Sequence, residues 1–254
     1  MTFPRKRNLP LSEACDSHVH IVGLTSQFPQ AADRSYTAGL ANLESLRALA
    51  QPIGVSRYVL VQPSFYGTDN NYLLETLYVL EGNGRGVVVV DPAVVTSRQL
   101  EEYERRGVRG VRVNFYSKVS PLASAGFSSA LRRFMEILPR ANWHVEIIAT
   151  LPTLVSAADS IRRLTLPIVI DHYGLPDDTT PESDLGRSLL DLLCLPHDLP
   201  VGALEAPSLG RAEGFRIELD RTSRIVHGER WRDSRVARRD RIHFAHGIGL
   251  RCLG

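Results

Sequence analysis

The chain has 254 residues, of which 43% are hydrophobic, and its formal net charge at pH 7 is +2. This length fits one domain of barrel size, and the hydrophobic share is enough for a large core. The small net charge, without a long basic run, argues against nucleic acid as the main partner, and no apolar run reaches the length of a membrane span.

Cysteine usage and the first residues indicate the compartment. Cys15, Cys194 and Cys252 are odd in number and lack metal-ligand spacing, which indicates reduced thiols. The first ten residues carry charge but no apolar stretch, so they do not resemble a secretory signal. We therefore expect a cytoplasmic protein, and the sequence leaves open whether it is a monomer or a homo-oligomer.

The first predicted element is a strand over residues 14–22 that carries two histidines, His18 and His20. Residues two apart in a strand point to the same face, so both imidazoles aim in one direction. Taken alone, such a pair is more often packed in a core strand than part of an active site. The rest of the chain has to distinguish these interpretations.

Apolar runs rich in Val and Ile then alternate with amphipathic segments. The predicted strands cover residues 57–64, 86–92, 110–115, 143–149 and 166–172, and the predicted helices cover 40–49, 71–77 and 129–138. Nearly continuous apolarity is typical of parallel strands covered on both faces. The alternation predicts a single-domain (β/α)8 TIM barrel, with an open doubly wound sheet as the alternative.

Polar side chains gather where these strands end. They are His18, His20, Gln62, Asp91, Arg112, Asn114, His144, Glu146, Asp171 and His172. In a barrel, the carboxyl ends of the strands form the active-site face. Burying so many polar groups without partners would be costly, so the set predicts a site, although a single member such as Asp91 before Pro92 fits a turn equally well.

Several segments resemble the amidohydrolase-related hydrolases that are similar to 2-pyrone-4,6-dicarboxylate lactonase. The matching segments are 14–20, 60–70, 90–92, 107–115, 143–145 and 170–174. The most specific is the Gln-Pro-Ser-Phe-Tyr-Gly-Thr-Asp-Asn string of residues 62–70. The resemblance implies a barrel hydrolase acting on a small carboxylate-bearing lactone or ester, with a link to aromatic catabolism.

The resemblance also implies roles for individual residues. Water would attack a carbonyl polarised by the catalytic histidines His18, His20 and His172. The resemblance implies substrate contacts for Arg112 and Lys118, and from the polar residues of the strands we add Gln62, Asn114 and His144 as substrate-binding candidates. A guanidinium at position 112 would hold a substrate carboxylate bidentately, whereas the ammonium at position 118 gives a less directional contact.

Cofactor use follows from the same resemblance. The lactonase-like branch implies no metal and a strand-8 aspartate that activates water. Wider amidohydrolase relatives imply zinc, which would be bound here by His18, His20 and His172. We expect no cofactor, with Zn²⁺ as the alternative.

The pattern departs from the family after residue 195. The expected strand-8 aspartate falls on Gly247, beside His246, and a strand-7 Tyr-Arg pair falls on Ser208 and Leu209. Ten arginines occur between residues 211 and 241. We therefore expect one domain over 1–254 that is well matched over 1–195, with strands 7 and 8 atypical or incomplete. We expect residues 196–254 to be divergent or translated from a shifted reading frame, which translation of the neighbouring frames would test. The alternative is that the arginine-rich part is a solvated surface helix.

The sequence thus predicts a hydrolase of the amidohydrolase superfamily with a small anionic substrate and neither a nucleic-acid nor a membrane partner. Two alternatives stay open. One is a zinc-dependent amidohydrolase or decarboxylase. The other is a degraded family member that binds an anion without turnover, because the strand-8 aspartate is missing.

Overall fold

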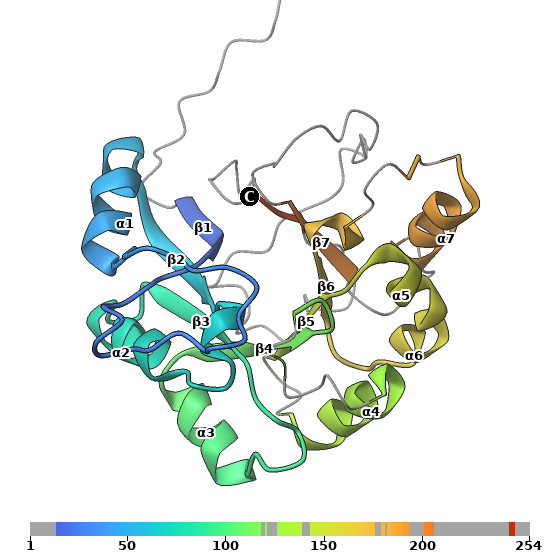
Figure 1. Ribbon diagram of the computed structural model, residues 1–254, viewed down its shortest axis with the longest axis horizontal. Helices are drawn as coiled ribbons and strands as arrows, with labels where there is room; N and C mark the ends of the chain where they lie inside the picture. The colour runs from blue at the N-terminus through green and yellow to red at the C-terminus, as the bar shows by residue number, and fades with distance from the viewer. Residues whose placement is uncertain are drawn as a thin grey trace, which may run out of the picture.

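The computed structural model describes residues 14–117, 120, 126–138, 143–175, 179–180 and 182–193, and the backbone of 201–205 and 244–246. Within this part a single parallel sheet forms the centre, and its strands follow one another in chain order. Figure 1 shows the strands curving around a common centre. The strands are β1 Ala14–Val19, β2 Val55–Val61, β3 Gly84–Val88, β4 Val108–Asn114, β5 His144–Ile148, β6 Ile168–Asp171, β7 Val201–Glu205 and β8 Phe244–His246.

Helices lie outside the curved sheet (Figure 1) and connect its strands. They are α1 Leu43–Ala50, α2 Asn71–Val79, α3 Ser97–Arg105, α4 Phe127–Ile137, α5 Leu151–Ser156, α6 Ala158–Arg162 and α7 Asp184–Leu193. Short 3₁₀ turns occur at η2 Gln51–Ile53, η3 Ser64–Tyr66 and η4 His172–Gly174. The chain is therefore an α/β protein with a parallel sheet, as the alternation predicted.

The core fills the space between sheet and helices. Leu60, Val111 and Ile147 are fully buried on the strands, and Phe134 of α4 packs in the same cluster. Helix α2 lies so close to β3 that a Cβ at Gly84 would stand 2.9 Å from Leu77 Cδ2. Glycine at this position is required by close approach of a helix to a strand.

The strand predictions agree in order and position with β1 to β6, with ends that differ by a few residues. One difference concerns β3, which ends at Val88 and not at residue 92. Asp91 therefore lies in a turn, where its Oδ1 accepts a hydrogen bond of 2.8 Å from the Ala93 amide. Asp91 is a turn-capping residue, one of the two interpretations that the sequence allowed.

The two C-terminal strands have backbone positions in the sheet. β7 pairs in parallel with β6, and β8 pairs in parallel with β7. No hydrogen-bonded ladder between β1 and β8 occurs among the residues that the structure describes. Gly247, Ser208 and Leu209 lie outside those residues, as does the side chain of His246. Among the described helices, none is long and apolar enough to cross a membrane.

Candidate active site

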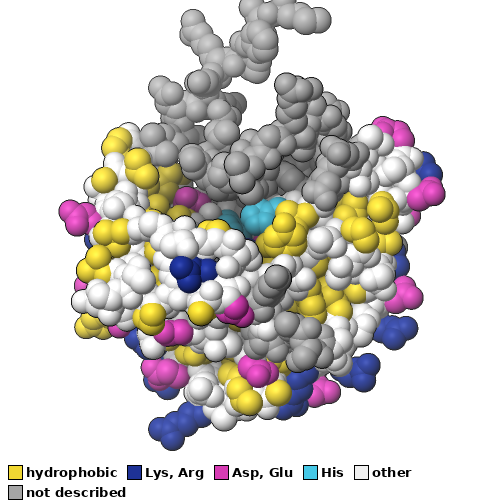
Figure 2. Space-filling model, viewed as in Figure 1, with side chains coloured by type: hydrophobic (Ala, Val, Ile, Leu, Met, Phe, Trp, Pro, Cys, Tyr) yellow, Lys and Arg dark blue, Asp and Glu magenta, His cyan; other side chains and the backbone are white. Residues whose placement is uncertain are grey.

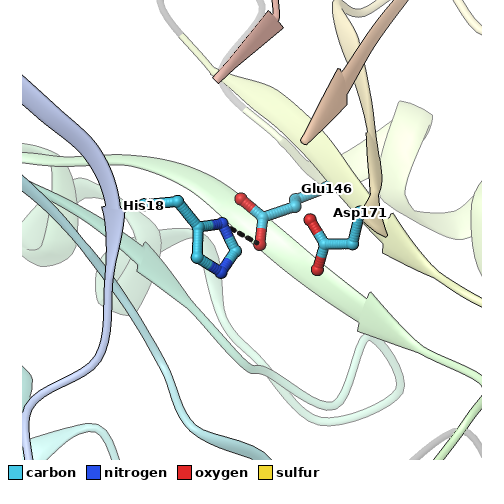
Figure 3. Close-up of side chains that lie close together, drawn as sticks. All are labelled: His18, Glu146 and Asp171. Atoms are coloured by element: carbon cyan, nitrogen blue, oxygen red, sulfur yellow. Dashed lines mark ion pairs between the residues drawn. The ribbon is translucent and has the colours of Figure 1, made fainter. Parts of the chain in front are cut away.

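Four buried or nearly buried polar side chains meet inside the curved sheet. His18 comes from β1, Arg112 from β4, Glu146 from β5 and Asp171 from the end of β6. Arg112 and Glu146 are register partners on adjacent strands, so their side chains leave the sheet on one face. Figure 3 shows His18, Glu146 and Asp171 pointing toward one another. Because side chains alternate between the two faces of a strand, these four side chains point to the same place inside the sheet.

Arg112 is the centre of this group. Its Nη2 donates a hydrogen bond of 2.6 Å to Asp171 Oδ2, and its Nε lies 3.0 Å from the same oxygen and 3.3 Å from Glu146 Oε1. Its Nη1 donates to the Gln62 carbonyl at 3.2 Å. Burial alone would lower the pKa of Arg112, but the Asp171 and Glu146 carboxyls raise it. The guanidinium therefore stays charged. It is held in place by Glu146 of β5, Asp171 of β6 and the Gln62 carbonyl that follows β2.

Glu146 is a carboxyl group that tends to keep its proton. Burial, and secondly the neighbouring Asp171 carboxylate, raise its pKa well above the ordinary value, against the opposing effect of Arg112. With Glu146 protonated, Arg112 balances Asp171 alone. The net charge of Arg112, Glu146 and Asp171 together is then near zero.

The imidazoles in this cluster are neutral at physiological pH. Burial, Arg112 and His172 lower the pKa of His18 to about 2. Burial lowers the pKa of His172, an effect that Arg112 strengthens and Asp171 opposes. The ring centroids of His18 and His172 are 6.0 Å apart. Neutral imidazoles can donate or accept a proton through hydrogen bonds, according to their tautomer.

His20 has the best-defined hydrogen bond of the three histidines. Its Nδ1 lies 2.7 Å from the carbonyl oxygen of Val61, at the end of β2. Its ring centroid is 5.1 Å from that of His18. Burial, Arg112 and His18 lower the pKa of His20 to about 3, although the bond to Val61 acts in the opposite direction. His20 is therefore an oriented, neutral imidazole.

Several buried polar atoms at this point have no hydrogen-bond partner among the described residues. They are both ring nitrogens of His18, Oε1 of Glu146, Oδ1 of Asp171 and Nδ1 of His172. His18 Nδ1 and Glu146 Oε1 are 3.7 Å apart, beyond a hydrogen bond (Figure 3). A buried polar atom without a partner costs about 1–3 kcal/mol. Their concentration in one place is expected of a site that receives a polar ligand or water.

Two of the predicted substrate-binding residues organise loops. Gln62 Nε2 donates to the Asp69 carbonyl at 2.6 Å, which holds the chain after β2. Asn114 Oδ1 accepts from the amides of Tyr116 and Ser117 at 2.9 and 2.8 Å, which shapes the turn after β4. Both side chains are buried. The hydrogen bonds of Gln62 and Asn114 therefore hold the chain segments that follow β2 and β4.

Of the other three predicted substrate contacts, Arg112 lies in the cluster, His144 lies away from it and Lys118 falls outside the described chain. His144 is the first residue of β5, and it pairs in register with Gly110, toward the amino ends of the strands. Lys118 falls outside the residues that the structure describes. The structure thus brings together His18, His20, Arg112 and His172, but it does not bring His144 to the same place.

Glu146 and Asp171 are the residues whose importance the sequence did not reveal. Both are polar residues near predicted strand ends, but the sequence assigned neither of them a role. The available signal was a carboxylate inside an apolar strand, Val145-Glu146-Ile147, because an inward carboxyl in such a run requires a partner. The partner, Arg112, lies 34 positions earlier in the chain, so only the register of β4 and β5 identifies it.

The same residues can be tested against a metal ion. One atom from each of His18, Glu146 and Asp171 lies within 4.8 Å of the other two. Arg112, however, already places a positive charge 2.6 Å from Asp171 Oδ2 and 3.3 Å from Glu146 Oε1. Its field also lowers the pKa of His18, His20 and His172, and the same repulsion opposes a divalent cation. Three possible ligand atoms and an opposing guanidinium charge thus meet at the same point.

Comparison with known proteins places the chain in a family. The profile described as amidohydrolase matches residues 15–193. A 4-sulfomuconolactone hydrolase from Hydrogenophaga intermedia is 31% identical over 72% of this chain and 59% of its own length. A 2-pyrone-4,6-dicarboxylate hydrolase from Comamonas testosteroni is 31% identical over 65% of this chain and 53% of its own. The chain therefore spans between half and two thirds of these relatives.

A solved structure agrees in fold. The crystal structure of a probable 2-pyrone-4,6-dicarboxylic acid hydrolase from Acinetobacter baumannii, with citric acid bound, aligns with a TM-score of 0.62 and 25% identity. The alignment covers 75% of this chain and 69% of that one. The family match covers most of the described elements, from β1 to α7. The chain belongs to the amidohydrolase family.

Proposed function

We propose that this protein hydrolyses a small lactone or ester that carries a carboxylate. The observation that carries the proposal is the cluster of three neutral histidines around the fixed guanidinium of Arg112, on the inner face of a parallel sheet. A water-attack reaction needs groups that exchange protons and stabilise charge on a carbonyl oxygen. Imidazoles and a buried cation supply both.

In the proposed reaction, a water molecule attacks the substrate carbonyl beside His18, His20 and His172. The imidazoles form the hydrogen bonds to water and carbonyl. Arg112, Glu146 and Asp171 are buried and paired with one another, so their charges keep fixed positions during the reaction. Arg112 donates a hydrogen bond from each of its three nitrogens, and we propose that its two remaining N–H groups bind a substrate carboxylate.

The substrate class rests on charge and on the relatives. Both curated relatives are named for lactones that carry acidic groups, and the crystal structure contains a polycarboxylic acid. The described cluster has a net charge near zero, so a second substrate carboxylate requires a cation from another part of the chain. We assign that contact to Lys118, as expected from the sequence. The proposed partner is a small anionic molecule.

We infer that the reaction proceeds without a metal ion, because Arg112 occupies the place of the positive charge between Glu146 and Asp171. Dialysis of the purified protein against a chelator is the test. Hydrolysis should be unchanged afterwards, and added zinc should not increase it. Loss of activity on dialysis that zinc alone restores would show a zinc-dependent enzyme instead.

We also infer that the sheet closes as an eight-stranded barrel within one domain over residues 1–254. Support comes from the neighbouring positions of β8 and β1 and from the fold of the relatives. An amide hydrogen-exchange measurement tests this closure. Slow exchange in both β1 and β8 is expected of a closed barrel, whereas fast exchange along β8 alone would contradict it.

The proposed activity is tested with lactones that carry none, one or two carboxylates. We expect ring opening by the full chain to be fastest with a carboxylate-bearing lactone and to be absent with the neutral one. The proposal fails if the protein opens none of the lactones. Thermal stabilisation by the same molecules without any hydrolysis would identify an anion-binding protein instead.

A further inference from the structure

We propose that His20 is the general base of this site, and that the carbonyl group of Val61 assigns it that role by fixing its tautomer. The inference rests on the proposed function for the reaction, but its structural part holds independently of any substrate. It addresses a specific gap, since Gly247 stands where a water-activating aspartate is expected from the family pattern.

The tautomer follows from the partner of Nδ1. The Val61 carbonyl oxygen can only accept a hydrogen bond, and it lies 2.7 Å from His20 Nδ1. Nδ1 therefore carries the hydrogen. A neutral imidazole carries a hydrogen on only one ring nitrogen, so Nε2 of neutral His20 carries none and presents a lone pair. A neutral His20 can thus accept a proton at Nε2, but it cannot donate one to a substrate carbonyl.

The position of Nε2 suits such a role. His20 is only partly buried, and no hydrogen bond to its Nε2 occurs among the described residues. Figure 2 shows histidine side chains, in cyan, visible near the centre of the face in view. A water molecule at that surface can donate to the lone pair. His18, by comparison, has two ring nitrogens that are buried and without a partner among the described residues, so its tautomer is not fixed by a bond.

The chemical step balances without any further reactant. Water gives one proton to His20 Nε2 while its oxygen forms a bond to the carbonyl carbon of the lactone. The ring C–O bond then breaks, and the leaving oxygen takes the proton from the His20 imidazolium. The product is the ring-opened acid, and His20 returns to its neutral tautomer.

Substrate binding would strengthen this base. Arg112 and His18 lower the proton affinity of His20, and Asp171 and the Val61 carbonyl raise it. A substrate carboxylate placed beside Arg112 offsets the guanidinium charge, so the proton affinity of His20 rises when substrate is present.

Nitrogen NMR of ¹⁵N-histidine-labelled full-length protein at pH 7 tests the structural part directly. We expect the His20 signal to show a protonated Nδ1 and an unprotonated Nε2. His20→Asn identifies the signal and preserves a donor toward Val61, because the Asn amide nitrogen occupies the place of Nδ1. A protonated Nε2 in the unmodified protein would overturn the inference, whether or not any lactone is hydrolysed.

Kinetics test the catalytic part. His20→Asn should lower kcat by about 100-fold or more, the usual contribution of a general base, with the melting temperature nearly unchanged. His20→Gly should regain activity in proportion to added imidazole, because free imidazole takes the vacated place. A kcat of His20→Asn within about threefold of the unmodified protein would overturn the role of base, since a general base contributes far more. Absence of turnover in the unmodified protein would instead count against the proposed function.

Discussion

At the scale of single residues, Arg112 determines the state of its neighbours. It pairs with Asp171 and Glu146 inside the protein, where all three side chains are less than 5% exposed. Its field favours neutral histidines around it. Arg112 was predicted as a substrate contact, and its visible partners are internal carboxyls. A substrate anion at Arg112 would therefore share the guanidinium with Asp171.

Replacement of Arg112 should lower the free energy of unfolding. Arg112→Met leaves the Asp171 carboxylate buried without its partner, so the free energy of unfolding should fall by about 3–5 kcal/mol. Arg133 pairs with Glu136 at 3.0 Å on the surface, where both side chains are about half exposed. The control Arg133→Met should cost less than about 1 kcal/mol. Urea unfolding measures both, and equal losses would contradict a special role of Arg112.

The low pKa values of the histidines predict the direction of acid destabilisation. In the unfolded chain both His18 and His20 bind a proton near pH 6.5, but in the folded protein they do so only near pH 2 and 3. Between these limits the unfolded state binds more protons, so stability falls as the pH falls. Glu146, with its raised pKa, acts oppositely above pH 4.5, where its retained proton makes stability fall as the pH rises.

The histidine effect should therefore be clearest below pH 4.5, the ordinary pKa of a glutamate. Urea unfolding measured from that pH down to about 3 should show uptake of up to two protons on unfolding from these residues. His20→Asn removes one of them, so its stability should depend less steeply on pH than that of the unmodified protein. Parallel pH dependences of the two proteins would contradict a neutral His20.

At the scale of elements, hydrophobic pattern alone predicted β1 to β6, because continuous runs of Val and Ile are typical of parallel strands buried on both faces. The helical segments given as examples did not include α5, α6 and α7, nor α3. The apolar residues of α3 are few, and this helix is defined by a capping box in which Thr96 and Gln99 bond each other's backbone amides. Strand register was also beyond the sequence. Without it, neither the pairing of Arg112 with Glu146 nor the distance of His144 from the cluster could be predicted.

The contact between β4 and β5 gives a test of this register. A Cβ at Gly110 would lie 2.6–2.9 Å from three atoms of the His144 ring. Gly110→Ala should therefore destabilise the protein by about 1–3 kcal/mol. In a His144→Ala background the same change should cost less, because the ring that it displaces is absent. Equal costs in both backgrounds, measured by urea unfolding, would show that the two residues are not in contact.

At the scale of the whole molecule, the protein is a curved parallel sheet with an internal, nearly neutral polar cluster. The family match ends at residue 193, and the two curated relatives extend well beyond the part that this chain covers. The family pattern expects a catalytic base on strand 8. In our proposal His20, which directly follows β1, takes that role. The chemistry is therefore assigned to histidines that β1, β2 and β6 position.

The most direct test of this claim is the turnover of a carboxylate-bearing lactone by the full chain and by its His172→Asn variant. His172 lies beside His18 and directly after Asp171, and Asn preserves a polar side chain of similar reach. We predict measurable ring opening by the unmodified chain and a loss of at least about 100-fold in the variant, with folding intact. Equal turnover by the two proteins would contradict this assignment.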